Sequence, residues 1–389
     1  MTTRFPSRAL VLASLAACGI IGGYSTMIAG SKNGFFEAIG ACARGTTGEP
    51  YIPGGPAPFK TSYTGISAVD NQLLVLVTFF ATLIDGEKSW AVRLSLWYLM
   101  VQLWAGWSLL SLEGLRKGNR GRVVSWTGTM GIIFQNISYT ITVPIYLMIH
   151  LLTSPLAQPT PGSSHLFTVD DLDLKLLPLC TMAALVIPSI AMALPSPSYV
   201  SASTHYTWIA IWQAFPLWQT TLHWTLKRIL PSPTAPTPRK HHHQTPTAAI
   251  YKIILLLSVA SQSTLLLIAL TPPTAVPEQW RPVFSAVTVS SAFVPAPFWT
   301  PPTTTVTAAI PADALPPLAH FFLQWDVYCG GAAVLLWAVY LRRAAGGGGG
   351  GGWGRALGWG VLGGPVAAAA VLLWERDEVV GRRGEGKGE

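Results

Sequence analysis

The acidic side chains that interrupt apolar stretches are the groups of this sequence best suited to chemistry. Asp326 follows Trp325 at the start of an apolar run, and the next basic residue after it is Arg342. A carboxyl buried among aromatic rings without a counter-charge stays protonated and can act as a general acid. We therefore expect Asp326 to donate a proton. The alternative is an acid that caps a helix at the membrane interface.

Glu113 is the second candidate acid. It follows the apolar run 91–112 and precedes the basic residue Arg116. A charged side chain at a membrane boundary either has a function or forms an ion pair. The position of Glu113 favours an interfacial ion pair to Arg116, with a functional acid as the alternative.

A stretch predicted as one helix, 125–152, carries polar and aromatic side chains at intervals of four, three, four and four residues. This spacing places them on one face of a helix. Such a face does not point at lipid, so it lines a cavity or forms hydrogen bonds to neighbouring helices. The residues are Gln135, Tyr139, Thr142, Tyr146 and His150, and Pro144 is expected to bend the helix.

A second predicted helix, 206–226, has an aromatic face. Trp208 and Trp212 share this face with Phe215, and Pro216 interrupts it. Aromatic faces attract cations strongly where water is excluded. Such a stripe more often serves packing, and the alternative is that the two stripes wall a pocket for an apolar ligand or a carbocation.

The elements that position these side chains are membrane helices. Of the 389 residues, 50% are hydrophobic and 11% are charged, whereas a soluble domain carries about 25% charged residues. So little charge does not solvate a surface of this size, which excludes a disordered protein and a soluble enzyme. The net charge of +8 lies in short clusters between apolar runs, which is typical of juxtamembrane loops and not of nucleic-acid binding. We expect an all-α, polytopic transmembrane helical bundle.

Seven to nine transmembrane helices are predicted, within a single integral membrane domain over residues 1–374. Each needs about 20 mainly apolar residues. A Pro-rich loop at 229–247, a Gly linker at 346–352 and a polar tail at 375–389 complete the chain. The candidate helices are 9–29, 69–85, 91–112, 125–152, 175–194, 206–226, 250–270, 318–341 and 356–374.

The positions of the basic loops conflict with a count of nine helices. Strict alternation of nine helices puts the basic loops 116–122 and 227–240 on opposite faces. Cytoplasmic loops carry the excess of Lys and Arg in membrane proteins, so both should lie on one face. One helix is therefore expected to be missed, added or broken, and the Pro-rich region 175–226 is the expected place.

Motifs for metal-dependent or cofactor-dependent chemistry are missing from the sequence. It has no DDxxD string to bind magnesium diphosphate, and neither a P-loop nor a GxGxxG opens a helix. It has no GxSxG, and no Cys and His spacing suggests zinc. We expect no metal, no cofactor and no nucleic-acid partner.

Several short strings look familiar when taken together. They are Tyr63-Thr64-Gly65-Ile66 with Asp70 and Phe79-Phe80, the string 113–121, Pro144-Ile145-Tyr146, the string 150–155, and the string 322–326. Together they resemble fungal integral membrane proteins of secondary-metabolite clusters, of which the membrane-bound terpene cyclases of the ascochlorin and ascofuranone type are the best characterised. The resemblance covers residues 60–330 in scattered blocks, and the loops 229–247 and 344–355 have no counterpart.

The resemblance implies a metal-independent cyclase of meroterpenoid biosynthesis. Such an enzyme protonates the epoxide or an alkene of a prenylated aromatic or polyketide substrate, the cation closes rings, and a base removes a proton. A pocket without water protects the cation from capture. The resemblance implies that Asp326 or Glu113 is the acid.

The resemblance also implies roles for other side chains. Three residues are expected to orient the epoxide oxygen or to take the final proton: Gln135, Tyr146 and His150. The cation is expected to lie against Trp208, Trp212 and Trp325, and Tyr139 completes the predicted substrate-binding set.

A non-catalytic membrane component or transporter of a biosynthetic gene cluster is the alternative function, and a cyclase relative that has lost catalysis is a third. A transporter is expected to show charges paired between helices and repeat symmetry, and neither is evident from the sequence. In each case we expect a multi-pass protein of the endoplasmic reticulum or another endomembrane. Its partners are membrane lipids and, for the cyclase, a lipophilic prenylated small molecule.

Overall fold

The structure is a computed structural model that describes residues 7–45, 52, 55–56, 58–86, 88–159, 163–231, 245–305, 310, 313–346 and 351–385. All regular secondary structure within these residues is helical, so the all-α prediction is confirmed. The predicted Pro-rich loop and Gly linker lie largely outside the described residues, whereas residues 375–385 of the predicted polar tail are the end of the last helix, Gly351–Glu385.

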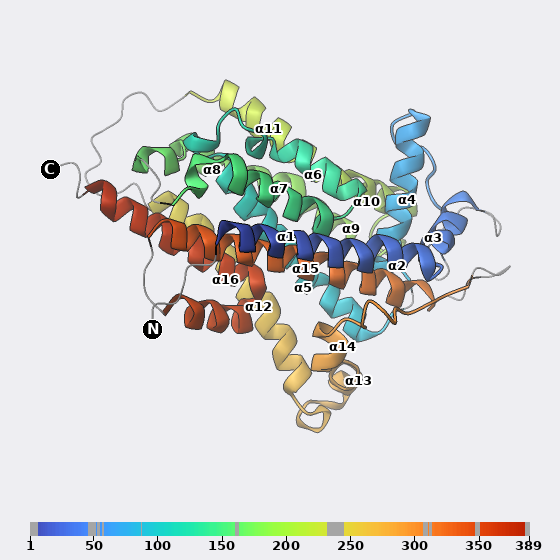
Figure 1. The fold of residues 1–389 in the computed structure, drawn as a ribbon. Coiled ribbons are helices and arrows are strands. Elements are labelled where there is room, and N and C mark those ends of the chain that lie inside the picture. The colour runs from blue at the N-terminus through green and yellow to red at the C-terminus, as the bar shows by residue number, and fades with distance from the viewer. Residues whose placement is uncertain are drawn as a thin grey trace.

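Within the described part of the chain, six helical stretches are long and apolar enough to cross a membrane. The chain is therefore a multi-pass membrane protein, but the predicted number of seven to nine membrane helices is not confirmed. Three predicted helices are broken, 125–152, 206–226 and 356–374. Helix α4, Ser67–Ile84, stands across the others at one end of the molecule (Figure 1). The six stretches are Arg8–Lys32, Ser67–Ile84, Ser164–Met192, Thr247–Leu270, Leu315–Ala344 and Gly354–Arg383.

The centre of the bundle is α15, Leu315–Ala344, which packs against α1, Arg8–Gly23, and against α7, Tyr139–Thr153. These three helices lie side by side along the long axis (Figure 1). On its other sides α15 contacts α5, Trp90–Gly114, and α16, Gly351–Glu385.

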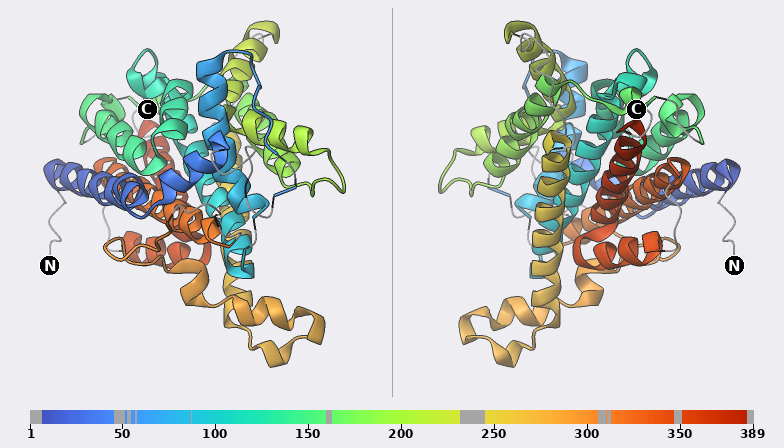
Figure 2. Two further views of the ribbon diagram at one scale, coloured as in Figure 1. Left: turned by 90° about the vertical axis from the view of Figure 1, so that its right-hand side faces the viewer. Right: turned by 90° about the vertical axis from the view of Figure 1, so that its left-hand side faces the viewer.

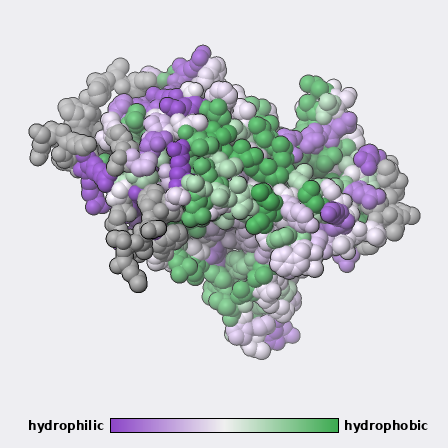
Figure 3. Space-filling view, viewed as in Figure 1, coloured by the Kyte–Doolittle hydropathy of each residue, from purple (hydrophilic) through white to green (hydrophobic). Residues whose placement is uncertain are grey.

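The remaining helices surround this centre. They are α2 Ala29–Lys32, α3 Phe35–Arg44, α4 Ser67–Ile84, α8 Asp171–Thr181, α9 Ile187–Met192, α10 Ala202–Gln213, α11 Phe215–Ile229, α12 Thr245–Leu270, α13 Arg281–Ala286 and α14 Val289–Phe293. Hydrophobic residues form a broad band across the middle of the surface in Figure 3, and hydrophilic residues gather toward its left and right. This is the surface pattern of a protein embedded in lipid.

The predicted helix 125–152 is a helical hairpin instead. α6, Thr127–Asn136, and α7, Tyr139–Thr153, meet at residues 137–138. The Tyr146 hydroxyl donates to the Val124 carbonyl at 2.6 Å, and Arg122 donates to the Thr153 carbonyl at 2.8 Å. The segment before α6 therefore lies beside the C-terminal part of α7. Because α6 is only about 15 Å long, the tip of this hairpin lies at mid-depth in the bundle.

The last helix is also a hairpin. Gly364 has a φ of 84°, which breaks α16 into two limbs just before Pro365. Arg355 and Glu375 form an ion pair of 2.9 Å, whereas a straight helix would hold them about 30 Å apart. Figure 2 shows the two limbs meeting at an angle. The residues predicted as one span, 356–374, therefore bend at Gly364, and the second limb folds back toward the first.

The predicted helix 206–226 is interrupted at Ala214, where α10 ends and α11 begins. Pro216 follows as an early residue of α11, where its missing N–H costs no hydrogen bond. Trp208 and Trp212 thus lie on α10, whereas Gln219 and His223 lie on α11.

Candidate functional site

Asp326 lies at the tip of the hairpin formed by α6 and α7. Its side chain comes from the middle of α15 and is 6% exposed. The carboxyl accepts hydrogen bonds from the Ser138 hydroxyl at 2.7 Å and from the Thr140 backbone N–H at 2.9 Å. The first N–H groups of a helix have no acceptor within it. Asp326 therefore caps a helix, as the alternative prediction states. The helix that it caps is α7, whereas Asp326 itself belongs to α15.

The carboxyl of Asp326 has no cationic partner among the described residues, whose ion pairs all involve other acids. What faces it is the N-terminal end of α7, whose dipole is positive. A carboxyl in this position can exchange a proton without breaking an ion pair. Burial without a counter-charge favours the protonated form that a general acid needs, whereas the two donors and the helix dipole favour the carboxylate.

Tyr139 is threaded between two glycines beside this carboxyl. A Cβ on Gly330 would overlap the Tyr139 ring, and a Cβ on Gly106 would overlap its hydroxyl. The residue is 1% exposed, and its hydroxyl has no hydrogen-bond partner among the described residues. A buried polar atom without a partner is costly and calls for an explanation. A substrate oxygen is one group that would satisfy this hydroxyl.

An aromatic belt links the two sides of Asp326. Neighbouring ring centroids in the belt lie 4.7–6.3 Å apart. One end is Phe322, one helical turn before Asp326, and the other is Tyr139, between the two residues that bind Asp326. The belt consists of Phe35, Phe36, Phe322, Phe79, Phe80, Trp212, Phe215, Trp107, Phe134 and Tyr139.

Two amide side chains adjoin the belt in sequence. Gln135 follows Phe134 on α6, and its amide nitrogen is buried without a partner among the described residues. Gln213 follows Trp212 on α10, and its amide oxygen is likewise buried without a partner among the described residues. Both amides thus leave a buried polar atom that a ligand could bond.

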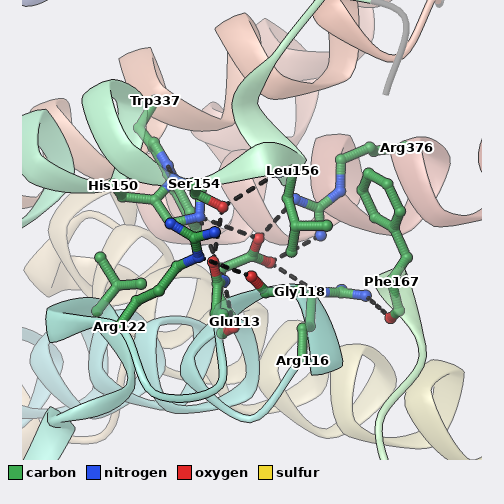
Figure 4. Close-up of polar contacts among 12 residues, drawn as sticks. Glu113, Arg116, Gly118, Arg122, His150, Ser154, Leu156, Phe167, Trp337 and Arg376 are labelled. Atoms are coloured by element: carbon green, nitrogen blue, oxygen red, sulfur yellow. Dashed lines mark hydrogen bonds and ion pairs between the residues drawn. The ribbon is translucent and has the colours of Figure 1, made fainter. Parts of the chain in front are cut away.

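Glu113 lies in a separate, charged cluster at the end of α5 (Figure 4). Its Oε2 accepts from Arg116 Nε at 2.7 Å and from Arg376 Nη2 at 2.8 Å. Asp377 accepts from Arg116 Nη2 at 2.7 Å and from the Tyr251 hydroxyl at 2.9 Å. The cluster joins α5, α12 and α16 and is almost closed to solvent.

The electrostatics of this cluster keep its charges in place. Burial alone would lower the pKa of the Arg116 guanidinium, but Asp377 and Glu113 outweigh burial and hold that pKa above its ordinary value. Arg116 therefore stays charged. Facing Arg116 and Arg376, Glu113 is held as a carboxylate, and together with Asp377 it balances the two guanidinium charges.

His150 completes the cluster in a fixed tautomer. Its Nδ1 accepts from the Trp337 indole N–H at 3.1 Å, and its Nε2 lies 3.3 Å from Glu113 Oε1. Because an indole only donates, Nδ1 carries no proton, and Nε2–H points at Glu113. His150 is thus engaged on both sides.

The predicted site residues are therefore divided between two places. Asp326 and Trp337 are separated by about 16 Å along α15, and Trp337 is bonded to His150 beside Glu113. Tyr139 lies with Asp326, and Gln135 lies on the other limb of the same hairpin. Tyr146 lies nearer the charged cluster, bonded to the Val124 carbonyl.

The three predicted tryptophans have different surroundings. Trp212 is part of the belt, and its indole donates to Ser189 Oγ at 2.8 Å. Trp208 lies one turn before it and is half-buried. Trp325 donates to the Ala296 carbonyl at 3.0 Å and packs edge-to-face on Phe298. Trp325 thus faces the segment that follows α14.

Sequence reasoning missed the residues that hold Asp326 in place, Ser138 and Thr140, and most of the phenylalanines of the belt. The string Asn136-Ile137-Ser138 carries the only local signal, since Asn and Ser are common at helix ends. Within the described residues, no group of three or more His, Cys, Asp or Glu side chains is placed to hold a metal ion.

A shallow crevice lies on another side of α5. It is bounded by α5, α8 and α12 and does not include Asp326, Glu113 or Tyr139. Its lining is Trp104, Ser108, Leu177, Pro178, Thr181, Ile250, Ile253 and Ile254.

Comparison with known proteins adds to this geometry. A family model described as the CtvD domain matches residues 8–381. The chain is 27% identical to terpene cyclase ascI of Acremonium egyptiacum, over 98% of the chain and 94% of that protein. It is 22% identical to terpene cyclase ctvD of Aspergillus terreus, over 90% and 93%, and 27% identical to terpene cyclase verU1 of Penicillium polonicum, over 85% and 82%. No solved structure matches.

Proposed function

The chain belongs to the CtvD domain family, and on this premise we propose that it is a membrane-bound terpene cyclase that starts cyclisation by protonating its substrate. The relatives named above are terpene cyclases of fungi. The observation that carries the proposal is the position of Asp326, an acid without a counter-charge enclosed between the two ends of an aromatic belt. The substrate is a lipophilic prenylated compound with a terminal epoxide or an alkene.

The reaction is an isomerisation, so its atoms balance without a co-reactant. Asp326 gives its proton to the epoxide oxygen or to an alkene carbon. An epoxide C–O bond then breaks, or the alkene π bond is consumed, and a cation forms. A second double bond attacks the cation, and a new C–C bond closes each ring. Loss of a proton from carbon ends the sequence and can restore the Asp326 carboxyl.

The residues around Asp326 have distinct parts in this proposal. The belt stabilises the migrating cation through the negative faces of its rings. The Tyr139 hydroxyl and the Gln135 amide meet the substrate oxygen, because both have buried polar atoms without partners. Packing of the bundle around the belt keeps water from capturing the cation.

Glu113 and His150 do not contact the substrate in this proposal. A carboxylate between two guanidinium groups does not release a proton, because it has none to give. His150 is bonded on both ring nitrogens and lies about 16 Å from the level of Asp326. We assign both residues to positioning α5, α7, α15 and α16, rather than to contact with the substrate.

The test compares two buried aspartates that both accept backbone N–H groups, Asp326 and Asp70. Asp326→Asn keeps the shape and removes the proton, so conversion of the epoxidised precursor falls about 100-fold or more. Asp70 is 5% exposed, lies in the first turn of α4, and accepts hydrogen bonds from the Thr64 and Gly65 N–H groups of the segment before that helix. Asp70→Asn should leave conversion unchanged. The readout is a cyclic product of unchanged mass in a host that makes the precursor.

The competing function is a membrane component that moves the precursor without converting it. Two observations favour it. Helical hairpins that end inside the membrane occur in transporters, and Glu113 on α5 pairs with Arg376 on α16, a charge pair between helices. In the same host, faster export of the precursor with no new isomer supports this alternative. A cyclic isomer formed at the normal rate by Asp326→Asn shows instead that Asp326 is not the acid.

A further inference from the structure

The basic side chains of the bundle gather at one end. The N-terminus of α1, the C-termini of α5, α7, α11, α15 and α16, and the start of α12 all meet there, at the left of Figure 1. The described basic residues at this end are Arg8, Arg116, Lys117, Arg120, Arg122, Lys175, Lys227, Arg228, Lys252, Arg342, Arg343, Arg355, Arg376, Arg382 and Arg383. We call this surface the basic end.

Direct contacts tie these segments together. Arg8 donates to the Leu151 carbonyl at the end of α7. Arg120 and Lys227 both pair with Asp173, at 3.6 and 2.6 Å. Loops that are far apart in the sequence therefore lie on the same surface.

The hairpin of α6 and α7 explains why these loops share a surface. Counted as one crossing, residues 125–152 would place the basic loop 116–122 and the end of α11 on opposite faces. Because the hairpin returns to the end where it began, both fall on the same face. The hairpin of α16 does the same for Arg342 and Arg382. The conflict between the positive-inside rule and the predicted helix count thus disappears.

The opposite end carries a different balance of charge. Acidic residues there nearly match the basic ones, and Asp85, for example, faces His205 at 3.0 Å. The described basic residues at this end are Lys32, Arg44, Lys60, Lys88, Arg93 and Arg281, and the acidic ones are Glu37, Asp70, Asp85, Glu278 and Asp313. At the basic end, basic residues clearly outnumber the acids, which are Glu113, Asp170, Asp171, Asp173, Glu375, Asp377 and Glu378.

We propose that the basic end faces the cytosol and lies against the anionic lipid headgroups of the cytosolic leaflet. Charge complementarity selects this partner, since that leaflet attracts Lys and Arg beside membrane helices. Arg382, Arg355 and Arg120 are 74%, 70% and 46% exposed, so each can contact a headgroup beside the acid with which it pairs, Glu378, Glu375 or Asp170. Both helical hairpins then enter the membrane from the cytosolic leaflet, and Asp326 binds the tip of one at mid-depth.

The sidedness is tested by cysteine labelling of the full-length protein in sealed microsomes with the cytosolic face outward. Arg382→Cys marks the basic end, and Tyr199→Cys, at a side chain 77% exposed between α9 and α10, marks the other end. A membrane-impermeant maleimide should label Arg382→Cys in sealed vesicles and Tyr199→Cys only after detergent. The unmodified chain gives the background of its own cysteines.

Every other labelling pattern overturns the proposed sidedness. Labelling of Tyr199→Cys alone in sealed vesicles reverses the orientation. Labelling of both, or of neither until detergent is added, places the two ends on the same side of the membrane. None of these outcomes bears on Asp326→Asn, so sidedness and catalysis are tested independently.

The headgroup contact is tested with the purified protein in vesicles. Phosphatidylserine added to phosphatidylcholine should raise Tm by roughly 2–4 °C at low salt. High salt should remove the shift, because it screens exposed charges. The double variant Arg355→Gln/Arg382→Gln should show a smaller shift than the unmodified protein. Equal Tm values in the two vesicles would exclude a contact with anionic headgroups.

Discussion

The carboxyl of Asp326 accepts the backbone N–H of Thr140 at 2.9 Å, so that an acid in the middle of one helix caps the first turn of another. A helix that begins inside a membrane exposes N–H groups where no water can bond to them. Asp326 satisfies one of these groups and binds the Ser138 hydroxyl as well. The same side chain therefore stabilises the hairpin tip and presents the acid to the belt.

Removal of the second contact separates these two roles. Ser138→Ala deletes a hydroxyl donor and leaves the Asp326 carboxyl in place. The loss of one buried hydrogen bond to a carboxyl should cost about 1.5–3 kcal/mol of stability. Thermal unfolding in detergent gives the cost, and Ser62→Ala, which removes a 3.2 Å contact to Asp70, serves as the matched control. Conversion should fall far less in Ser138→Ala than in Asp326→Asn. An equal fall would make positioning of α7, and not the proton, the function of Asp326.

Two tyrosines of the same helix allow a cleaner separation of stability from function. Tyr139→Phe removes a buried hydroxyl that has no partner, so stability should be unchanged or slightly higher. Tyr146→Phe breaks a hydrogen bond of 2.6 Å and should cost about 1 kcal/mol. If the Tyr139 hydroxyl binds the substrate oxygen, Tyr139→Phe lowers conversion although the protein is stable. Full conversion by Tyr139→Phe would exclude this contact.

Glu113 is expected to matter for folding rather than for proton transfer. Glu113→Gln leaves two buried guanidinium groups facing a neutral amide, which should cost about 3–5 kcal/mol. Arg376→Met in the same chain removes one of the stranded charges and should recover part of the loss. The measurements are Tm and the yield of folded protein. A Glu113→Gln protein that is stable but no longer converts the precursor would instead support Glu113 as the proton donor.

The sequence predicts the individual acids better than it predicts their surroundings. Asp326 is conspicuous because charges are rare in apolar runs, and its burial follows from the same pattern. The break at residues 137–138 has no comparable local signal, because its cap comes from a residue 188 positions away. A period of 3.6 residues continues by chance from Gln135 to His150 across this break, so that one predicted face belongs to two antiparallel helices.

The aromatic belt and the charged cluster could not be predicted from the sequence for the same reason. Phe80 meets Trp212, and Glu113 meets Arg376, only because distant helices pack together. The local sequence predicts Glu113 with Arg116, and this ion pair is present at 2.7 Å. The second guanidinium, which changes Glu113 from a candidate acid to a shared anion, comes from a segment predicted as a polar tail.

The bend of α16 exposes backbone carbonyls that three side chains satisfy. Gln262 donates to the Gly360 and Val361 carbonyls at 3.0 and 2.6 Å, and Gln102 donates to the Gly363 carbonyl at 2.9 Å. The Leu362 carbonyl accepts from Ser263 at 3.1 Å. Carbonyls left without a partner in lipid are costly, so these side chains should hold the hairpin closed.

Gln262→Leu should therefore destabilise the protein although it makes a membrane helix more apolar. Two carbonyls lose their donor, at about 1–3 kcal/mol each, which outweighs the gain from a more apolar side chain. Leu256→Ala, at a lipid-facing position of the same helix that is 69% exposed, is the control and should change Tm little. The second limb of α16 carries Arg376, so loosening it should also weaken the ion pair to Glu113. Limited proteolysis after Arg376 should then be faster in Gln262→Leu than in Leu256→Ala. If Gln262→Leu is as stable as the unmodified protein, the carbonyls at the bend have other donors, and the amide does not hold the hairpin closed.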